Sequence, residues 1–173
     1  MLNFIYFLIL VILISAGAAS LSLAPWVPTR QKDLERIFDL AGLKNGEFFY
    51  DLGCGNGKVL LFGGRRYQGA NFLGLELAPL LYLICKFRRG LSGLLNVQFR
   101  LKNLYQENLA KADVVYIFAA APEKLTGRII DKLKKELKQG SRIITYAFPI
   151  KGWSPVRIDK PKPNDIAIYL YRI

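Results

Sequence analysis

The sequence predicts an α/β fold, a three-layer sandwich in which helices cover both faces of a mostly parallel β-sheet. Short apolar runs alternate with segments of helical periodicity through most of the chain, a pattern typical of parallel strands joined by helices. Near the C-terminus, the runs 155–159 and 165–172 flank the turn-like segment 160–164. This second observation predicts a terminal antiparallel pair of strands.

The individual elements follow from local patterns. Residues 33–43 place apolar side chains on one helical face, Pro79 suits the first turn of a helix, and Gly140 suits a helix end. The run 112–121 is nearly all apolar, as a central parallel strand should be. We expect strands at about 47–52, 71–76, 96–101, 112–121 and 141–148, and helices at about 33–43, 58–67, 79–87 and 123–138.

Length and charge limit the classes of protein. The chain has 173 residues, enough for one domain of ordinary size, and a formal net charge of +12. Such a charge attracts anions, which could be nucleic acid, acidic protein or anionic lipid headgroups. Histidine is absent and the cysteines are Cys54 and Cys85, so we expect no metal site and no imidazole base. The spacing of the two cysteines gives no support for a disulfide.

The N-terminal residues 4–24 form an uncharged run of 21 residues, mostly Leu, Ile, Val, Phe and Ala. A helix of this length can cross a hydrocarbon core of roughly 30 Å, so we expect a transmembrane anchor at 1–24 and one domain at 25–173. A signal peptide is the alternative, although no Lys or Arg precedes the run. Because Arg30 and Lys32 follow it, the positive-inside rule predicts a single-pass membrane protein with its domain on the cytoplasmic side.

The helix expected at 79–87 is strongly apolar, which suits burial against the sheet or contact with lipid. Lys86, Arg88 and Arg89 lie at its C-terminal end. There they complement the helix dipole and could sit on anionic headgroups.

A glycine-rich turn after the first expected strand is the main candidate for a ligand-binding site in this chain. Gly53, Gly55 and Gly57 alternate there, and glycine lets the backbone turn sharply and approach a ligand closely. Asp51 precedes them at the carboxyl end of the strand, where open α/β sheets bind ligands, and a carboxylate suits an ammonium or hydroxyl group. Lys58 stands where a dinucleotide motif has its third glycine, and no Ser or Thr follows it as in a P-loop. A tight turn without a ligand remains an alternative.

Glu76 ends the second expected strand, 19 residues past Gly57. In a Rossmann-like unit an acid at this place binds ribose hydroxyls. The alternative is a surface glutamate that happens to end a strand.

The segment 51–57, Asp-Leu-Gly-Cys-Gly-Asn-Gly, resembles motif I of the class I S-adenosylmethionine-dependent methyltransferases. Over nearly its whole length the chain also resembles the small membrane-anchored protein-lysine methyltransferases that modify the ATP synthase c-subunit and the adenine nucleotide translocase. Besides the apolar anchor, the shared features are Val27-Pro28-Thr29, Glu76 with Pro79, Arg142-Ile143-Ile144, Phe148-Pro149, and Trp153 with Pro155. The resemblance implies a Rossmann-like fold of the class I methyltransferase type, S-adenosyl-L-methionine as cofactor, and a lysine of a membrane protein as substrate.

The resemblance also implies which residues bind the cofactor. Asp51 and the backbone of the first glycines would hold the methionine end, Glu76 the ribose and Asn103 the adenine. Pro28 and Thr29 would close over the site. The full expected set is Asp51, Gly53, Gly55, Gly57, Glu76, Asn103, Leu104, Pro28 and Thr29.

Two departures from the family pattern concern this set. Cys54 and Asn56 stand where motif I usually has Ser or Thr and Asp, and Asn103 stands where the family has Asp. The Asn103 amide keeps an acceptor oxygen but lacks the charge-assisted strength of a carboxylate. Cofactor binding should therefore survive with a lower affinity.

Methyl transfer from a sulfonium mainly requires alignment of a neutral nucleophile and exclusion of water. Residues 118–122 contain no acid and no Asn/Asp-Pro-Pro-Tyr segment, which argues against amide and nucleobase substrates, so we expect no nucleic-acid partner. No catalytic residue is assigned, because Tyr116 and Tyr146 suit the core better than proton transfer. The alternatives are a methyltransferase acting on a lipid or quinone, and a non-enzymatic domain that binds anionic lipid or nucleic acid.

Overall fold

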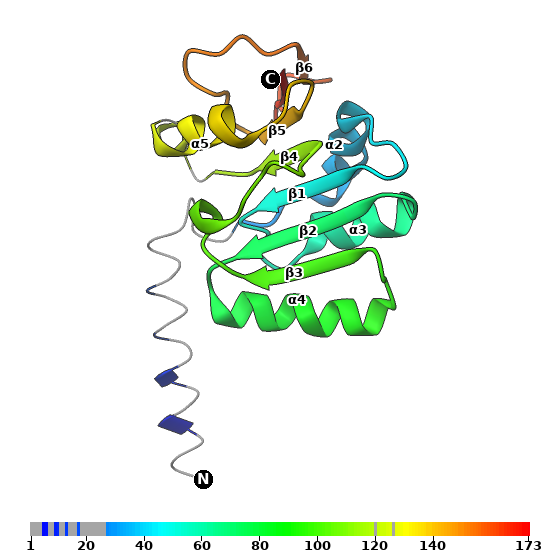
Figure 1. The fold of residues 1–173 in the computed structure, drawn as a ribbon, viewed down its shortest axis with the longest axis vertical. Helices are drawn as coiled ribbons and strands as arrows, with labels where there is room; N and C mark the ends of the chain where they lie inside the picture. Colours follow the sequence, from blue (N-terminus) through cyan, green and yellow to red (C-terminus); the bar gives the residue numbers. More distant parts are fainter. Residues whose placement is uncertain are drawn as a thin grey trace.

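The computed structural model describes residues 5, 6, 9, 10, 13, 17, 27–119, 121–125 and 127–173. Its middle layer is a seven-stranded sheet with the order β3-β2-β1-β4-β5-β7-β6 (Figure 1). The strands are β1 (Phe48–Leu52), β2 (Asn71–Glu76), β3 (Val97–Leu101), β4 (Val114–Ile117), β5 (Arg142–Tyr146), β6 (Arg157–Asp159) and β7 (Ile168–Arg172). The helices are α2 (Leu34–Ala41), α3 (Lys58–Arg66), α4 (Pro79–Ser92) and α5 (Arg128–Glu136), with 3-10 turns η1 (Gln31–Asp33), η2 (Leu104–Gln106) and η3 (Pro122–Lys124).

The order of the parallel strands determines where a ligand can bind. β1 pairs in parallel with β2 on one side and with β4 on the other. The chain therefore builds the sheet outward from β1 in one direction and then from β4 in the other. Ligands of open α/β sheets bind at the carboxyl ends of the strands beside such a switch point, here the edge where β1, β2 and β4 end.

Helices pack on both faces of the sheet. On one face, α2, α3 and α4 contribute Phe38, Leu60 and Cys85 to a core that also contains strand residues. On the other face, α5 contributes Ile129 and Leu133 to a second core. β7 pairs antiparallel with both β5 and β6. The predicted α/β sandwich, Rossmann-like with a mostly parallel sheet and an antiparallel end, is confirmed.

Three elements differ most from the sequence-based expectation, and several others differ by one to three residues at an end. The strand expected at 112–121 is shorter, because β4 ends at Ile117. The helix expected at 123–138 is divided into η3 and α5, because Gly127 precedes α5 with a φ of 53° and interrupts the helical backbone. α4 extends past the expected residue 87 to Ser92 and ends at Gly93, which has the left-handed conformation typical of a helix end.

The structure corrects the expected localisation, a single-pass membrane protein with its domain on the cytoplasmic side. None of the helices among the described residues is long and apolar enough to cross a bilayer. The longest of them, α4, has 14 residues, fewer than the ~20 that a span needs. Most of the anchor expected at 1–24 lies outside the described residues. The division into 1–24 and 25–173 remains a prediction.

Candidate active site

A tight turn carries the chain from β1 into α3. The N–H groups of Gly53 and Cys54 both donate to the Leu75 carbonyl of β2 at 2.9 Å, which fixes the start of the turn to the neighbouring strand. Gly53, Gly55 and Gly57 have φ values of 96°, 55° and 73°, in the left-handed region that favours glycine. The three glycines therefore have a conformational role in the turn.

The surroundings of these glycines differ. A Cβ on Gly57 would lie 2.6 Å from Phe99 Cζ and 3.1 Å from Cys85 Sγ, so packing also requires glycine there. A Cβ on Gly53 would have no neighbouring heavy atom within 4 Å, and Gly53 is exposed. Gly53 therefore borders open space at the carboxyl end of β1.

Glu76 is the last residue of β2 and is buried. Its carboxylate accepts three hydrogen bonds from backbone N–H groups. Oε2 accepts from Gly55 N–H at 2.8 Å, and Oε1 accepts from Leu77 and Ala78 N–H, each at 2.9 Å. Burial raises the pKa of Glu76, and the backbone donors partly oppose that shift. Glu76 thus ties the glycine turn to the end of β2. Because Glu76 is only 6% exposed, it is not the surface glutamate of the alternative interpretation.

Asp51 lies one residue before the end of β1, and its side chain is 2% exposed. No described residue donates a hydrogen bond to its carboxylate. Burial, reinforced by the charge of Glu76, raises the pKa of Asp51 well above its usual range. Among the described residues no fully buried side-chain oxygen or nitrogen lacks a hydrogen-bond partner, so the Asp51 oxygens keep a small contact with the outside. A ligand ammonium there would supply both a donor and the opposite charge. The residues present therefore fit the amino group of the methionine end of S-adenosylmethionine.

The segment containing Pro28 and Thr29 is held against the same edge of the sheet. Thr29 is buried, and its Oγ1 lies 2.9 Å from the hydroxyl of Tyr116 in β4. Lys58 Nζ, at the start of α3, donates to the Thr29 carbonyl at 2.8 Å. Tyr116 pairs in register with Asp51, so these contacts bring Thr29 close to the Asp51 strand, while Pro28 is exposed.

Asn103 and Leu104 follow β3 at the same edge. Lys102 N–H, just before them, donates to the Glu76 carbonyl at 3.0 Å, so this loop runs beside the end of β2. Asn103 Oδ1 accepts from Tyr105 N–H at 3.0 Å and caps η2, and Leu104 packs against the core on the α5 face. The structure thus gives Asn103 a capping role, and the proposed adenine contact must use its remaining hydrogen-bonding capacity.

Three contacts of the candidate site, two of them to the turn, could not be inferred from sequence. Cys85 Sγ, buried in α4, donates to the Gly55 carbonyl at 3.1 Å, and Arg88 Nη1 donates to the Asn56 carbonyl at 2.7 Å. The third contact is the hydrogen bond that Lys58 Nζ donates to the Thr29 carbonyl. The sequence shows only that basic residues follow the apolar run of α4. That pattern does not indicate that Arg88 contacts the turn.

The two candidate tyrosines are core residues, each 1% exposed. The Tyr116 hydroxyl is paired with Thr29, and the Tyr146 hydroxyl donates to Asp33 Oδ2 at 2.6 Å. Burial is the main cause of the raised pKa of both hydroxyls. Neither group is placed to accept a proton. Among the described residues, no cluster of acidic or cysteine side chains could hold a metal ion.

Comparison with known proteins identifies the family. The family model described as the ANTKMT methyltransferase domain matches residues 51–157, which include the turn, Glu76 and Asn103. The chain belongs to this family. It is 27% identical over 154 residues to a protein-lysine N-methyltransferase of Saccharolobus islandicus, covering 86% of this chain and 93% of that protein. It is 26% identical over 132 residues to the mouse lysine N-methyltransferase of the ATP synthase c-subunit, covering 76% of this chain and only about half, 51%, of the mouse protein.

A solved methyltransferase structure has the same fold. An RNA methyltransferase from Salinibacter ruber, solved with S-adenosyl-L-homocysteine, superposes with a TM-score of 0.79 at 25% identity and covers 85% of this chain and 94% of its own. The predicted class I methyltransferase fold and the predicted cofactor are thereby confirmed. The protein is an S-adenosylmethionine-dependent methyltransferase. The individual contacts of Asp51, Glu76, Asn103 and the other expected site residues remain predictions.

Proposed function

We propose that the protein transfers a methyl group from S-adenosylmethionine to the ε-amino group of a lysine in another protein. The observation that carries the proposal is the buried Asp51 carboxylate, which no described residue satisfies, at the strand end beside the Glu76-held turn. The similarity to a protein-lysine N-methyltransferase over 93% of that relative supports lysine as the acceptor.

In the proposed arrangement Asp51 receives the amino group of the cofactor, and the backbone of Gly53 and Gly55 lies alongside its methionine end. Glu76 Oε2 accepts one backbone N–H and keeps a second lone pair, which a ribose hydroxyl can use. The adenine is bordered by Asn103 and Leu104, and Gly57 ends the turn beside it. Pro28 and Thr29 cover the methionine end.

When bound, the cofactor supplies a methyl group on a positively charged sulfur, which a neutral amine can displace. The protein has to exclude water and hold the lysine amine neutral and in line with the sulfur–methyl bond. Histidine is absent from the chain and residues 118–122 contain no acid, so we assign no base. Desolvation at the apolar end of β4, where Phe118 and Ala119 follow the strand, favours the neutral amine.

The narrower part of the proposal is that the acceptor lysine belongs to a membrane protein. The curated relatives are named for the ATP synthase c-subunit and for adenine nucleotide translocase, and these names are its support. A second candidate is methylation of RNA, favoured by the Salinibacter ruber RNA methyltransferase and by the net charge of +12.

The test is incubation of the full chain with methyl-tritiated cofactor and, in separate arms, membranes, soluble protein and total RNA from the source cells. We expect label in protein that hydrolysis releases as methylated lysine, with the membrane arm strongest. Asp51→Asn serves as a matched control that removes the charge of the cofactor site with little change in side-chain size. Label in RNA would favour the second candidate, and label extracted with lipid would contradict both.

A further inference from the structure

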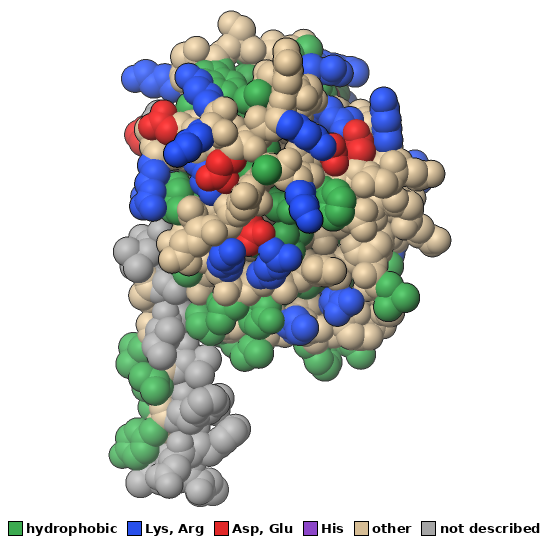
Figure 2. Space-filling view, in the orientation of Figure 1, with side chains coloured by type: hydrophobic (Ala, Val, Ile, Leu, Met, Phe, Trp, Pro, Cys, Tyr) green, Lys and Arg blue, Asp and Glu red, His purple; other side chains and the backbone are tan. Residues whose placement is uncertain are grey.

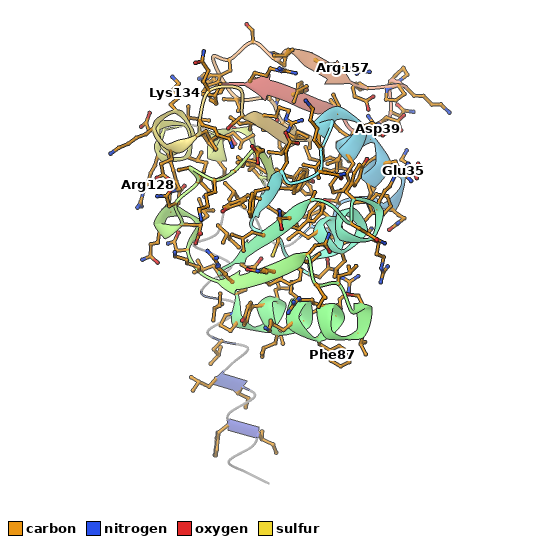
Figure 3. The ribbon with its side chains drawn as sticks, turned by 45° about the vertical axis from the view of Figure 1, so that its right-hand side comes forward. Glu35, Asp39, Phe87, Arg128, Lys134 and Arg157 are labelled. Carbon is orange, nitrogen blue, oxygen red and sulfur yellow. The ribbon has the colours of Figure 1, made fainter. Side chains whose placement is uncertain are left out.

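The outer face of α4 is apolar and exposed. Leu83, Ile84, Phe87 and Leu91 recur at helical spacing and so share one face, and their exposed fractions run from 37% for Ile84 to 75% for Leu91. Phe87, 68% exposed, projects from α4 away from the sheet (Figure 3). α4 lies beside β3 at one edge of the molecule. A contiguous apolar face of this kind marks an interaction surface.

The charges around this face have one sign. Between residues 52 and 106, Glu76 is the single acid, and it is buried in the cofactor site. The basic residues of the same stretch are Lys58, Arg65, Arg66, Lys86, Arg88, Arg89, Arg100 and Lys102. Arg100 and Lys102 pair with Glu107, whereas the other six have no carboxylate partner in the described part of the chain. Figure 2 shows hydrophobic and basic side chains side by side over the lower part of the domain, where Figure 1 places α4.

A basic hollow adjoins the apolar face. It has a volume of about 260 Å³ and is bordered by the cations Lys58, Arg65 and Arg88 and by apolar side chains that include Leu91. Leu91 belongs to both the hollow and the apolar face, so the two are continuous. Lys58 and Arg88 each donate to a backbone carbonyl of the site, and Arg65 is exposed with no partner among the described residues. Three cations around one hollow suit a phosphate group.

We propose that this surface, α4 with the adjoining basic hollow, docks on an anionic lipid bilayer, with Phe87 and its apolar neighbours at the acyl boundary and a lipid phosphate among Lys58, Arg65 and Arg88. Apolar residues flanked by Lys and Arg on a surface helix are the arrangement of interfacial helices, and each basic residue near an anionic surface adds to the attraction. The contact is with one leaflet and involves no spanning segment. An acidic protein with an apolar patch is the competing occupant, and the experiment below distinguishes it from a bilayer.

The experiment places an environment-sensitive probe on the surface of the full chain. Phe87→Cys is labelled with a nitrobenzoxadiazole maleimide, while the native Cys54 and Cys85 are buried. Ile158→Cys on β6 is the matched control, because Ile158 is also exposed, at 55%, and lies at the opposite edge of the sheet. Each labelled chain is mixed with phosphatidylcholine vesicles with and without phosphatidylglycerol, some carrying brominated acyl chains.

We expect the probe at position 87 to shift to shorter wavelength and to be quenched by brominated chains in phosphatidylglycerol vesicles, and the probe at position 158 to stay unchanged. Arg65→Glu should weaken vesicle binding of the position-87 chain roughly tenfold or more, since it removes one attraction and adds a repulsion. Arg157→Glu on β6 is the control and should change it little. Circular dichroism checks that each variant is folded.

The proposal is wrong if the position-87 probe is unquenched in anionic vesicles or is quenched equally in phosphatidylcholine alone. It is also wrong if soluble polyglutamate shifts the probe and anionic vesicles do not, which would indicate an acidic protein partner. Because the readout is the position of the probe and requires no turnover, a protein without lysine methyltransferase activity could still pass this test, and an active one could fail it.

Discussion

Replacing Asp51 by Asn should stabilise the cofactor-free protein and weaken cofactor binding. Asp51 is 2% exposed, receives no hydrogen bond from a described residue and lies near the charge of Glu76. An unsatisfied buried polar group costs about 1–3 kcal/mol, more when it is charged. The Asp51 oxygens keep a small contact with the outside, so the full cost does not apply. Removing the charge should therefore increase the free energy of unfolding by at most about 1–2 kcal/mol at neutral pH, because the amide is as buried as the carboxylate but not ionised.

The same charge has the opposite effect once the cofactor is bound. A charge-assisted hydrogen bond to the cofactor ammonium contributes about 1.5–3 kcal/mol, so Asp51→Asn should weaken binding roughly tenfold to a hundredfold. Thermal unfolding and titration calorimetry with S-adenosyl-L-homocysteine measure the two effects. For a chain of this size, 1–2 kcal/mol corresponds to a rise in Tm of roughly 2–8 °C. A lower Tm with unchanged affinity would refute the placement of Asp51.

The pH dependence of the cofactor-free protein provides a second check on Asp51. Its pKa is raised in the folded state, so the folded protein holds a proton that the unfolded chain releases. The stability contributed by this proton is fully present below the ordinary carboxyl pKa and is lost as pH rises through the raised pKa of the folded state. Stability of the wild type should therefore fall over that range, and Asp51→Asn should flatten the fall. An unchanged profile would contradict the assignment.

Three further substitutions test the turn and its supports. Glu76→Gln keeps the shape but loses at least one charge-assisted acceptor for backbone N–H, so both the Tm and the cofactor affinity should fall, the affinity roughly tenfold or more; a loss of affinity alone would contradict the structural role. Gly57→Ala should lower the free energy of unfolding by several kcal/mol, since its Cβ would clash with a phenylalanine ring. Gly53→Ala is strained at its positive φ but uncrowded, and should lower it by about 1 kcal/mol. Equal melting temperatures of the two variants would contradict this ranking. Tyr116→Phe removes the hydroxyl contact to Thr29 and should weaken cofactor binding a few fold while lowering the Tm by a few degrees, both measurable in the same assays.

Much of the fold was predictable because its signals are local. The apolar strand 48–52, the glycines after it and the acid at the end of β2 are each short patterns, and the sheet brings them together as parallel strands must. The interruption before α5 was harder to predict, because helical periodicity continues through Gly127, whose positive φ is not visible in the pattern of apolar residues. The length of α4 was misjudged because Arg88 and Arg89 look like the end of a helix, although both lie within it.

The supports of the site were not predictable, because they join residues far apart in the sequence. Lys58 contacts the Thr29 carbonyl across 29 positions, and Arg88 contacts the Asn56 carbonyl across 32. Neither pair has a spacing or composition signal. The role of Glu76 was predictable only in part. An acid at a strand end predicts a ligand contact, but it does not indicate that the same carboxylate accepts hydrogen bonds from backbone N–H groups.

α4 connects the two surfaces of the protein that carry proposals. On its inner side, Cys85 donates to the Gly55 carbonyl and Arg88 donates to the Asn56 carbonyl, so α4 holds the turn of the candidate site. Its outer side carries Phe87 and Leu91, and Arg88 also borders the basic hollow. Because Arg88 takes part in both, an anion in the hollow competes with the Asn56 carbonyl for the same guanidinium. If the docking proposal holds, anionic vesicles should therefore change the cofactor affinity of the protein. Replacing Arg88 should abolish that change in affinity. Replacing Arg65 should only shift the lipid concentration at which the change occurs.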